Sequence, residues 1–247
     1  MKKLLCIGVL LSGCAWAKPL ILTTEEAPPT NFSLDGGKTI TGSATDIVRE
    51  LFKRAAIEYT IGLYPWERAI DMAENEKNTC VYSTTRTPAR EKKFQWVGPV
   101  APNDWVLFAL ADSKISVATL DQAKKYKVGG YRGDAVALYL EEQKFKLDNG
   151  ANDEQSARKL QAGRIDIWAT GGQAGVWHVK KYGIKIKPLL TFKSTELYVA
   201  CNLGVAPATI DKLRKTMAAM LKDGTTATIH GSVRISVCEA DWMLAEA

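Results

Sequence analysis

The most informative stretch of this chain reads Ser83-Thr84-Thr85-Arg86-Thr87-Pro88-Ala89-Arg90-Glu91-Lys92-Lys93-Phe94 and continues through Gln95-Trp96-Val97-Gly98-Pro99. It begins where an apolar strand, Cys80-Val81-Tyr82, gives way to three hydroxyl residues, and Pro88 fixes a turn between two arginines. Arginine can hold a carboxylate through two parallel hydrogen bonds, and hydroxyl groups can complete the shell of donors. The stretch therefore indicates an anion site, although a strand end followed by a solvated basic loop has the same composition.

On both sides of this stretch, strands alternate with helices. Apolar runs predict strands at 20–24, 57–63, 78–84, 104–109, 127–130 and 164–170, another ending near 192, and one at 196–201. Helical spacing of apolar residues predicts helices at 44–56, 65–75, 120–126, 135–143, 153–163, 175–182 and 210–221. This alternation favours an α/β fold.

The first 17 residues have the features of a signal peptide. Two lysines follow the initiating methionine, Leu4 to Leu11 form an apolar segment too short to span a bilayer, and Ala15-Trp16-Ala17 is a small-x-small cleavage site. Leu11-Ser12-Gly13-Cys14 also resembles a lipobox, whose cysteine would be lipidated. We therefore expect a periplasmic protein, with anchoring through Cys14 as the alternative.

The pattern S-T-T-R-T-P-x-R-E-x-x-F-x-W-V-G-P resembles the bacterial extracellular solute-binding proteins of family 3, the receptors for polar amino acids in ABC transporters. The resemblance is specific in residues 79–99 and looser over the rest of the mature chain. It implies that Arg90 binds the α-carboxylate of a ligand, assisted by Ser83 and Thr85. It also implies a two-lobed periplasmic binding protein of type II, with two hinge crossings and a ligand cleft. Lobe one would comprise 18–102 and 194–247, and lobe two 103–193.

Composition narrows the class of partner. The formal net charge is +6 and would fall to +4 if the two lysines of residues 1–17 were removed. The basic residues are scattered, so we expect no nucleic-acid partner. The chain has two histidines and no cluster with metal-ligand spacing, so we expect neither a metal nor a cofactor.

Cleavage after Ala17 would leave three cysteines, Cys80, Cys201 and Cys238. Export permits a disulfide, and an odd number leaves at least one thiol unpaired. We expect Cys80 to act as a small apolar residue in its strand. Cys201 and Cys238 both fall in the C-terminal part, where they could pair or remain free.

Other candidate site residues follow predicted strands or open predicted helices. Glu25 follows the first strand and is either ligand cover or part of a solvated acidic loop. Trp66, just after Pro65, is a pocket wall or a core anchor. The turn Tyr131-Arg132-Gly133-Asp134 precedes a helix N-terminus, which favours anions. There Arg132 is a candidate ligand contact, and Asp134 is either the helix N-cap or a partner for a cationic group.

The edge at Thr170-Gly171-Gly172 departs from the family pattern. Thr170 is a candidate ligand contact, but relatives usually carry an aspartate just beyond this strand that pairs with the α-ammonium of the ligand. The matching residue here is Gly171. An ammonium partner would have to be Asp134, Glu25 or Glu26, or be absent.

We therefore expect a monomeric receptor that closes around a small anionic or zwitterionic solute. Its partner would be an ABC permease or, alternatively, a membrane sensor. An orphan binding domain, with the same fold and site but no transporter, is a further alternative. The competing class is an enzyme on the same fold, such as a periplasmic dehydratase or a lytic transglycosylase. Such an enzyme would need a positioned acid or base in the cleft.

Overall fold

The computed structural model describes residues 18–231, and the predicted signal segment, Cys14 and Cys238 lie outside this range. Its main sheet has the strand order β4-β1-β5-β9-β6-β8-β7. The strands are β4 (Tyr59–Leu63), β1 (Leu20–Thr24), β5 (Thr79–Thr85), β9 (Ile186–Asn202), β6 (Phe94–Leu110), β8 (Ile167–Gly171) and β7 (Val128–Gly129). A short hairpin joins β2 (Phe32–Ser33) to β3 (Ile40–Thr41).

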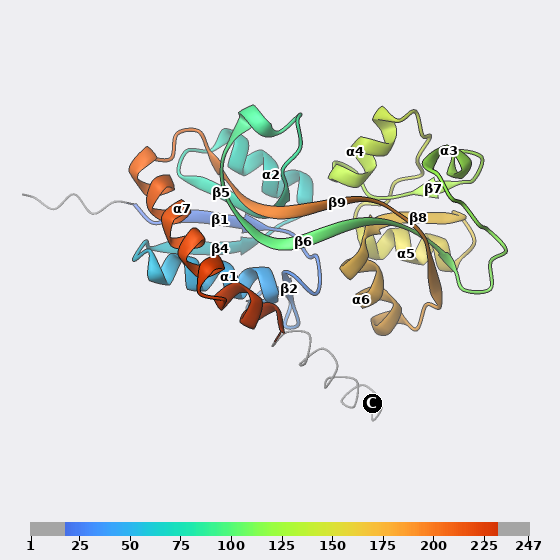
Figure 1. Ribbon diagram of the computed structural model, residues 1–247, viewed down its shortest axis with the longest axis horizontal. Helices are drawn as coiled ribbons and strands as arrows, with labels where there is room; N and C mark the ends of the chain where they lie inside the picture. The colour runs from blue at the N-terminus through green and yellow to red at the C-terminus, as the bar shows by residue number, and fades with distance from the viewer. Residues whose placement is uncertain (1–17, 232–247) are drawn as a thin grey trace, which may run out of the picture.

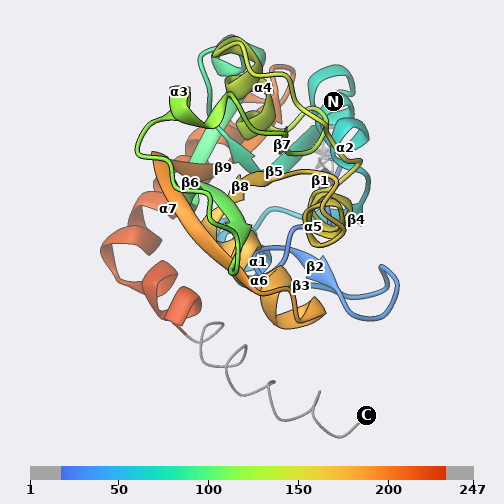
Figure 2. The same cartoon turned by 90° about the vertical axis from the view of Figure 1, so that its right-hand side faces the viewer.

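Helices cover the two halves of this sheet separately (Figures 1 and 2). The half with β4, β1 and β5 carries α1 (Ser43–Arg54), α2 (Trp66–Asn75) and α7 (Pro207–Lys222). The half with β8 and β7 carries α3 (Leu120–Ala123), α4 (Ala135–Glu142), α5 (Asp153–Gln161) and α6 (Gly172–Tyr182). Within residues 18–231, none of these helices has the length and apolarity needed to cross a membrane.

Each half buries its own apolar core because the helices present one apolar stripe to the sheet. In the first half, Leu51 of α1 and Met217 of α7 pack together in one buried cluster. In the second, Leu140 of α4 packs with Trp105 and Ile167 of the sheet. The two cores define two lobes, and the predicted two-lobed α/β fold is confirmed.

Two long strands, β6 and β9, run through both lobes (Figure 1). They pair antiparallel from Phe94 opposite Asn202 to Leu110 opposite Ile186, with several register shifts. The predictions of short strands at 104–109 and 196–201 were therefore wrong in extent. β6 tolerates Pro99 and Pro102 because β8 pairs with it only from Trp105 to Phe108, which leaves the earlier part of β6 as an edge. The limits predicted for the lobes stay a prediction.

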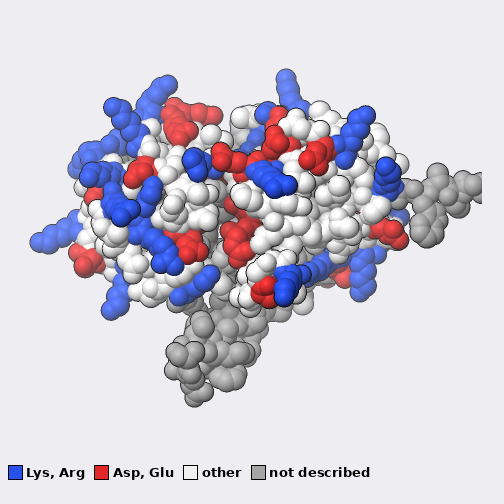
Figure 3. All heavy atoms as spheres, turned by 180° about the vertical axis from the view of Figure 1, so that it is seen from behind, with Lys and Arg blue, Asp and Glu red and all other residues white. Residues whose placement is uncertain are grey.

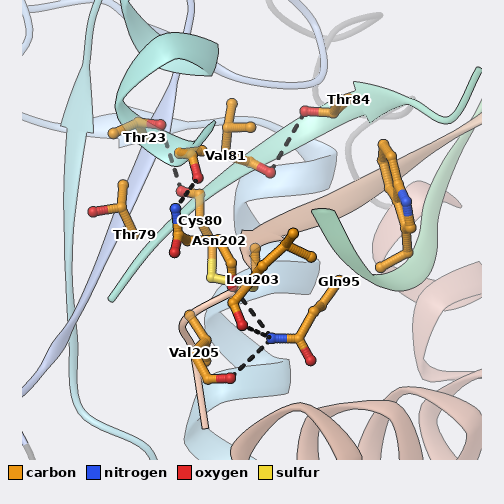
Figure 4. Close-up of a disulfide and its surroundings, with 12 residues drawn as sticks. Thr23, Thr79, Cys80, Val81, Thr84, Gln95, Asn202, Leu203 and Val205 are labelled. Atoms are coloured by element: carbon orange, nitrogen blue, oxygen red, sulfur yellow. Dashed lines mark hydrogen bonds between the residues drawn. A yellow bond between two sulfur atoms is a disulfide. The ribbon is translucent and has the colours of Figure 1, made fainter. Parts of the chain in front are cut away.

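A disulfide joins Cys80 of β5 to Cys201 of β9 (Figure 4). The two residues are directly opposite in the antiparallel register, and both are fully buried. The expectation that Cys80 is an unpaired apolar residue was wrong, and so was the possible pair of Cys201 with Cys238. The pairing depends on β5 and β9 being neighbours, although 121 residues separate the cysteines.

Candidate functional site

The two lobes enclose a cavity of about 70 Å³ at the ends of β1, β5 and β8 and the N-termini of α4, α5 and α6. This is the usual place for a ligand in an α/β protein. Its polar and aromatic lining includes Glu25, Trp66, Ser83, Thr85, Arg90, Asn103, Tyr131, Asp134, Asp153 and Thr170. Of the residues predicted to contact the ligand, Arg132 and the possible ammonium partner Glu26 are not part of this lining.

Arg90 is the cationic residue of the cavity lining, and its side chain is almost completely buried, with 6% of the residue exposed. Its Nη1 donates to the carbonyl oxygen of Thr85 at 3.3 Å and its Nη2 to that of Gly133, in the other lobe, at 2.9 Å. The guanidinium carbon lies 5.1 Å from the centre of the Trp66 ring. Burial lowers the pKa of Arg90, and nearby Asp134 acts in the opposite direction. A guanidinium keeps its proton under such shifts, so it remains a fixed positive charge.

Trp66 begins α2 directly after Pro65, whose φ of −54° suits the start of a helix. Its indole Nε1 donates to the carbonyl oxygen of Gly133 at 2.8 Å, across the gap between the lobes. The side chain also packs in a buried cluster with Ala69 and Phe94. The alternatives of pocket wall and core anchor are therefore both true of this residue.

Ser83 has a backbone conformation that is unusual for a residue other than glycine, with φ of 59°. The register of β5 against β9 shifts between Val81 and Thr84, so the strand is irregular at this residue. Among the described residues, the buried Oγ of Ser83 has no hydrogen-bond partner. A strained backbone and an unsatisfied hydroxyl in one cavity are typical of a binding site.

Thr85 and Asn103 form the part of the lining that faces β8. The Asn103 Nδ2 donates to Thr85 Oγ1 at 3.3 Å. A Cβ added to Gly171 would lie 2.6 Å from Asn103 Oδ1, much closer than packed atoms approach each other. A side chain at position 171 would therefore require the Asn103 side chain to move away from the end of β8.

Three carboxyl groups line the same cavity. Glu25 is 9% exposed and accepts a hydrogen bond at 2.9 Å from the Tyr131 hydroxyl, which links the two lobes. Asp134 is the N-cap of α4 and accepts from the Val136 backbone N–H. Asp153 accepts from Thr170 Oγ1 at 2.9 Å. Asp134 therefore caps a helix and also lines the cavity.

Burial raises the pKa of all three carboxyl groups, since an apolar environment disfavours the charged form. The pKa of Glu25 is raised well above its usual value, although its hydrogen bond from Tyr131 works against this. Burial, reinforced by the charge of Asp153, raises the pKa of Asp134 to about 7. Burial raises the pKa of Asp153 to about 6.

Two predicted participants do not reach the cavity. Arg132 is exposed, because its neighbour Tyr131 takes the inward position in the turn. Glu26, one of the possible ammonium partners, is exposed and its carboxylate accepts from the Ser33 backbone N–H. Arg86 lies at the surface in a bidentate pair with Glu91, with distances of 2.7 and 2.6 Å.

Asp153, Asn103 and Tyr131 also line the cavity, although none of them was predicted as a site residue. For Asp153 a signal existed, because Asn152 and Asp153 can both cap a helix and only one residue can occupy the cap. Asn152 is the N-cap of α5, and its side chain accepts from the Gln155 backbone N–H. Asp153 is then the first residue of the helix, and its carboxyl group is free to line the cavity. Within residues 18–231, no group of His, Cys, Asp and Glu is arranged to hold a metal ion.

Several solved structures share this fold at low sequence identity. A histidine kinase sensor domain with similarity to periplasmic binding proteins gives a TM-score of 0.81 at 17% identity, covering 87% of this chain and 95% of that one. An arginine transport periplasmic binding protein from Legionella pneumophila gives 0.74 at 19%, covering 87% and 99%. The ancestral amino acid-binding protein AncCDT-1, a precursor of cyclohexadienyl dehydratase, gives 0.74 at 20%, covering 87% and 94%.

Comparison with curated protein sequences gives no significant match. The sequence profile of the bacterial extracellular solute-binding proteins, family 3, matches residues 20–232. That range includes both lobes, both crossing strands and the whole lining of the cavity. The chain therefore belongs to the bacterial extracellular solute-binding proteins of family 3.

Proposed function

We propose that this protein captures a small carboxylate-bearing solute, an amino acid or a similar compound, between its lobes in the periplasm. The observation that carries the proposal is Arg90, a buried guanidinium on the wall of the cavity between the lobes. A carboxylate would replace the neutral carbonyl oxygens of Thr85 and Gly133 as its acceptor and would form stronger, charge-assisted bonds. Ser83, with its buried and unsatisfied hydroxyl, would donate a further hydrogen bond.

Binding would be coupled to a hinge motion. Hydrogen bonds from Arg90 and Trp66 to Gly133 and from Tyr131 to Glu25 cross between the lobes at the cavity. A solute that reaches the cavity must first break them and can then hold the lobes together through its own contacts. The hinge would lie in β6 and β9, near the lobe limits at 102/103 and 193/194.

The proposed partner is inferred from the family to which the chain belongs. A receptor of this family would deliver its solute to the permease of an ABC transporter, and we propose this role for a monomeric, exported chain. The similarity to a histidine kinase sensor domain makes a membrane sensor the alternative partner. Cells lacking this protein would lose uptake of the solute if the partner is a permease. They would lose the transcriptional response to the solute if the partner is a membrane sensor.

The test of the site is the variant Arg90→Ala. We expect it to lose most of the affinity for the solute, by about 100-fold or more, since a charge-assisted bidentate contact is removed. Arg86→Ala is the matched control, because that arginine is paired with Glu91 at the surface. Calorimetry that found equal affinity in the parent and in Arg90→Ala would reject the assignment.

An enzyme on the same fold is the second candidate function, and a specific observation favours it. Asp134 and Asp153 have pKa values raised to about 7 and about 6 by burial, a range suited to proton transfer at neutral pH. Incubation of pure protein with prephenate-like or peptidoglycan substrates tests this candidate. Turnover that is lost in Asp134→Asn would replace binding by catalysis as the function.

A further inference from the structure

An aromatic contact between the lobes lies outside the cavity. The Phe32 ring of β2 packs against the Trp177 ring of α6, with ring centres 5.0 Å apart and planes inclined at 46°. Figures 1 and 2 show the β2–β3 hairpin beside α6. Neither residue is part of the cavity lining, so this contact joins the lobes without using any part of the site.

Each ring is attached firmly to its own lobe. The segment that leads to Phe32 is held at the start of α1, where the Ala44 backbone N–H donates to the carbonyl oxygen of Thr30 at 2.9 Å. In the other lobe, α6 lies directly against β6, since a Cβ added to Gly175 would lie 2.5 Å from the Phe108 ring. The two rings therefore move with their lobes, and they separate when the lobes move apart.

The packing of the two rings indicates that apolar area is what they contribute. Phe32 is 8% exposed, although it belongs to neither of the buried clusters that form the lobe cores. The indole Nε1 of Trp177 is buried and, among the described residues, has no hydrogen-bond partner. The contact of Trp177 with the other lobe therefore depends on its ring and not on its N–H group.

Like charges oppose contact between the lobes. The cavity lining includes the carboxyl groups of Glu25 in lobe one and of Asp134 and Asp153 in lobe two. Burial raises the pKa of Glu25, and the charges of the two aspartates raise it further. Figure 3 shows that acidic side chains also lie along the boundary between the two halves of the molecule on its rear face. Burial of two rings is a favourable contribution to closure that does not depend on charge.

We infer that Phe32 and Trp177 form an aromatic clasp that holds the lobes together in solution without contacting the solute. They are positioning residues, because the apparent affinity for a solute that binds between joined lobes scales with the fraction of molecules whose lobes are joined. The inference goes beyond the proposed function, since it concerns the motion of the lobes and not the chemistry of the solute. The clasp strengthens the binding of every solute by the same factor.

Small-angle X-ray scattering of the full chain without solute tests the clasp. Phe32→Ala and Trp177→Ala should each shift the equilibrium toward separated lobes by at least ~10-fold, which increases the radius of gyration. The double variant should expand no further than the single variants, because either change already removes the contact. Trp177→Phe should remain close to the parent, since it keeps a ring and removes an N–H group without a partner among the described residues.

Leu34→Ala is the matched control, because Leu34 lies on the same hairpin and is 82% exposed. Its radius of gyration should equal that of the parent. Unchanged far-UV circular dichroism in the alanine variants of Phe32 and Trp177 would show that both lobes remain folded. Recovery of compactness in Trp177→Phe separates loss of the clasp from a general defect in packing.

Calorimetry with L-lysine and L-aspartate as probes separates this inference from the proposed function. Phe32→Ala should weaken each probe that binds by the same factor of ~10 or more, and unequal factors would place Phe32 in the site and overturn the inference. If both alanine variants are as compact as the parent, or the parent is already as expanded as they are, the clasp is overturned while carboxylate capture stands. If they expand and Arg90→Ala leaves the affinities unchanged, carboxylate capture fails while the clasp stands.

Discussion

Removal of the Cys80–Cys201 disulfide should cost this protein a large part of its stability. Both cysteines are in lobe one, but the chain between them includes the whole of lobe two, from β6 to β9. Closing a loop of 121 residues in the unfolded chain corresponds to about 5 kcal/mol at 25 °C in the chain-entropy treatment. Native disulfides removed from other proteins cost about 2–5 kcal/mol, which sets the range expected here.

The double variant Cys80→Ala/Cys201→Ala measures this contribution. Urea unfolding followed by tryptophan fluorescence and by far-UV circular dichroism gives a free energy wherever the two transitions coincide. With a slope of about 3 kcal/mol/M, a loss of about 2–5 kcal/mol lowers the midpoint by roughly 0.7–1.7 M. Solute affinity should stay near that of the parent, because neither cysteine is part of the cavity lining.

The single variant Cys238→Ala is the control for the pairing itself. If Cys201 were bonded to Cys238, this variant would lower the midpoint as far as the double variant does. A double variant whose midpoint lies within ~0.3 M of the parent, at unchanged slope, would refute the reasoning about the loop.

Three further predictions concern the cavity. The pKa values of Asp134 and Asp153 are about 7 and about 6 in the folded protein, against 3.8 for an ordinary aspartate. Between about pH 4 and pH 7 the folded state therefore binds more protons than the unfolded state, and the free energy of unfolding falls as the pH rises. The melting temperature should therefore be lower at pH 8 than at pH 5. If the melting temperature of Asp134→Asn changed with pH as steeply as that of the parent, this assignment would be contradicted. Gly171→Ala should cost about 1–3 kcal/mol, and adding Asn103→Ala should restore part of it by removing the clash, as urea midpoints can show. Trp66→Phe removes an N–H donor that links the lobes, so calorimetry should find affinity lowered by roughly 5-fold, and unchanged affinity would argue against a role in closure.

Local pattern was enough to predict much of this protein. Alternation of apolar runs and helical spacing gave the α/β class, because burial of one face leaves its period in the sequence. The run from Ser83 to Arg90 identified the cavity wall in β5 and the turn after it, since hydroxyl and guanidinium donors directly follow an apolar strand. The length of a strand was not predicted where pairing with a neighbouring strand decides it. β6 begins at Phe94 and continues through Pro99 and Pro102, because it pairs with β9 on both sides of these prolines.

The acidic residues of the site also include one that the sequence suggested and one that only the structure revealed. Asp134 was a candidate because it precedes a predicted helix. Asp153 was not a candidate, because it and its neighbour Asn152 could both serve as the N-cap of the next helix. Only packing shows that the N-terminus of α5 meets the end of β8, where Thr170 donates to Asp153.

The sequence alone therefore determined the class of fold, the family resemblance and the arginine with its hydroxyls. The tertiary structure decided the partner of Cys80, the continuity of the two crossing strands and the origin of the second charged group of the cavity. The physical reason is that side-chain chemistry and periodicity are local properties. Strand register and the meeting of a helix end with a strand end depend on contacts between residues far apart in the chain.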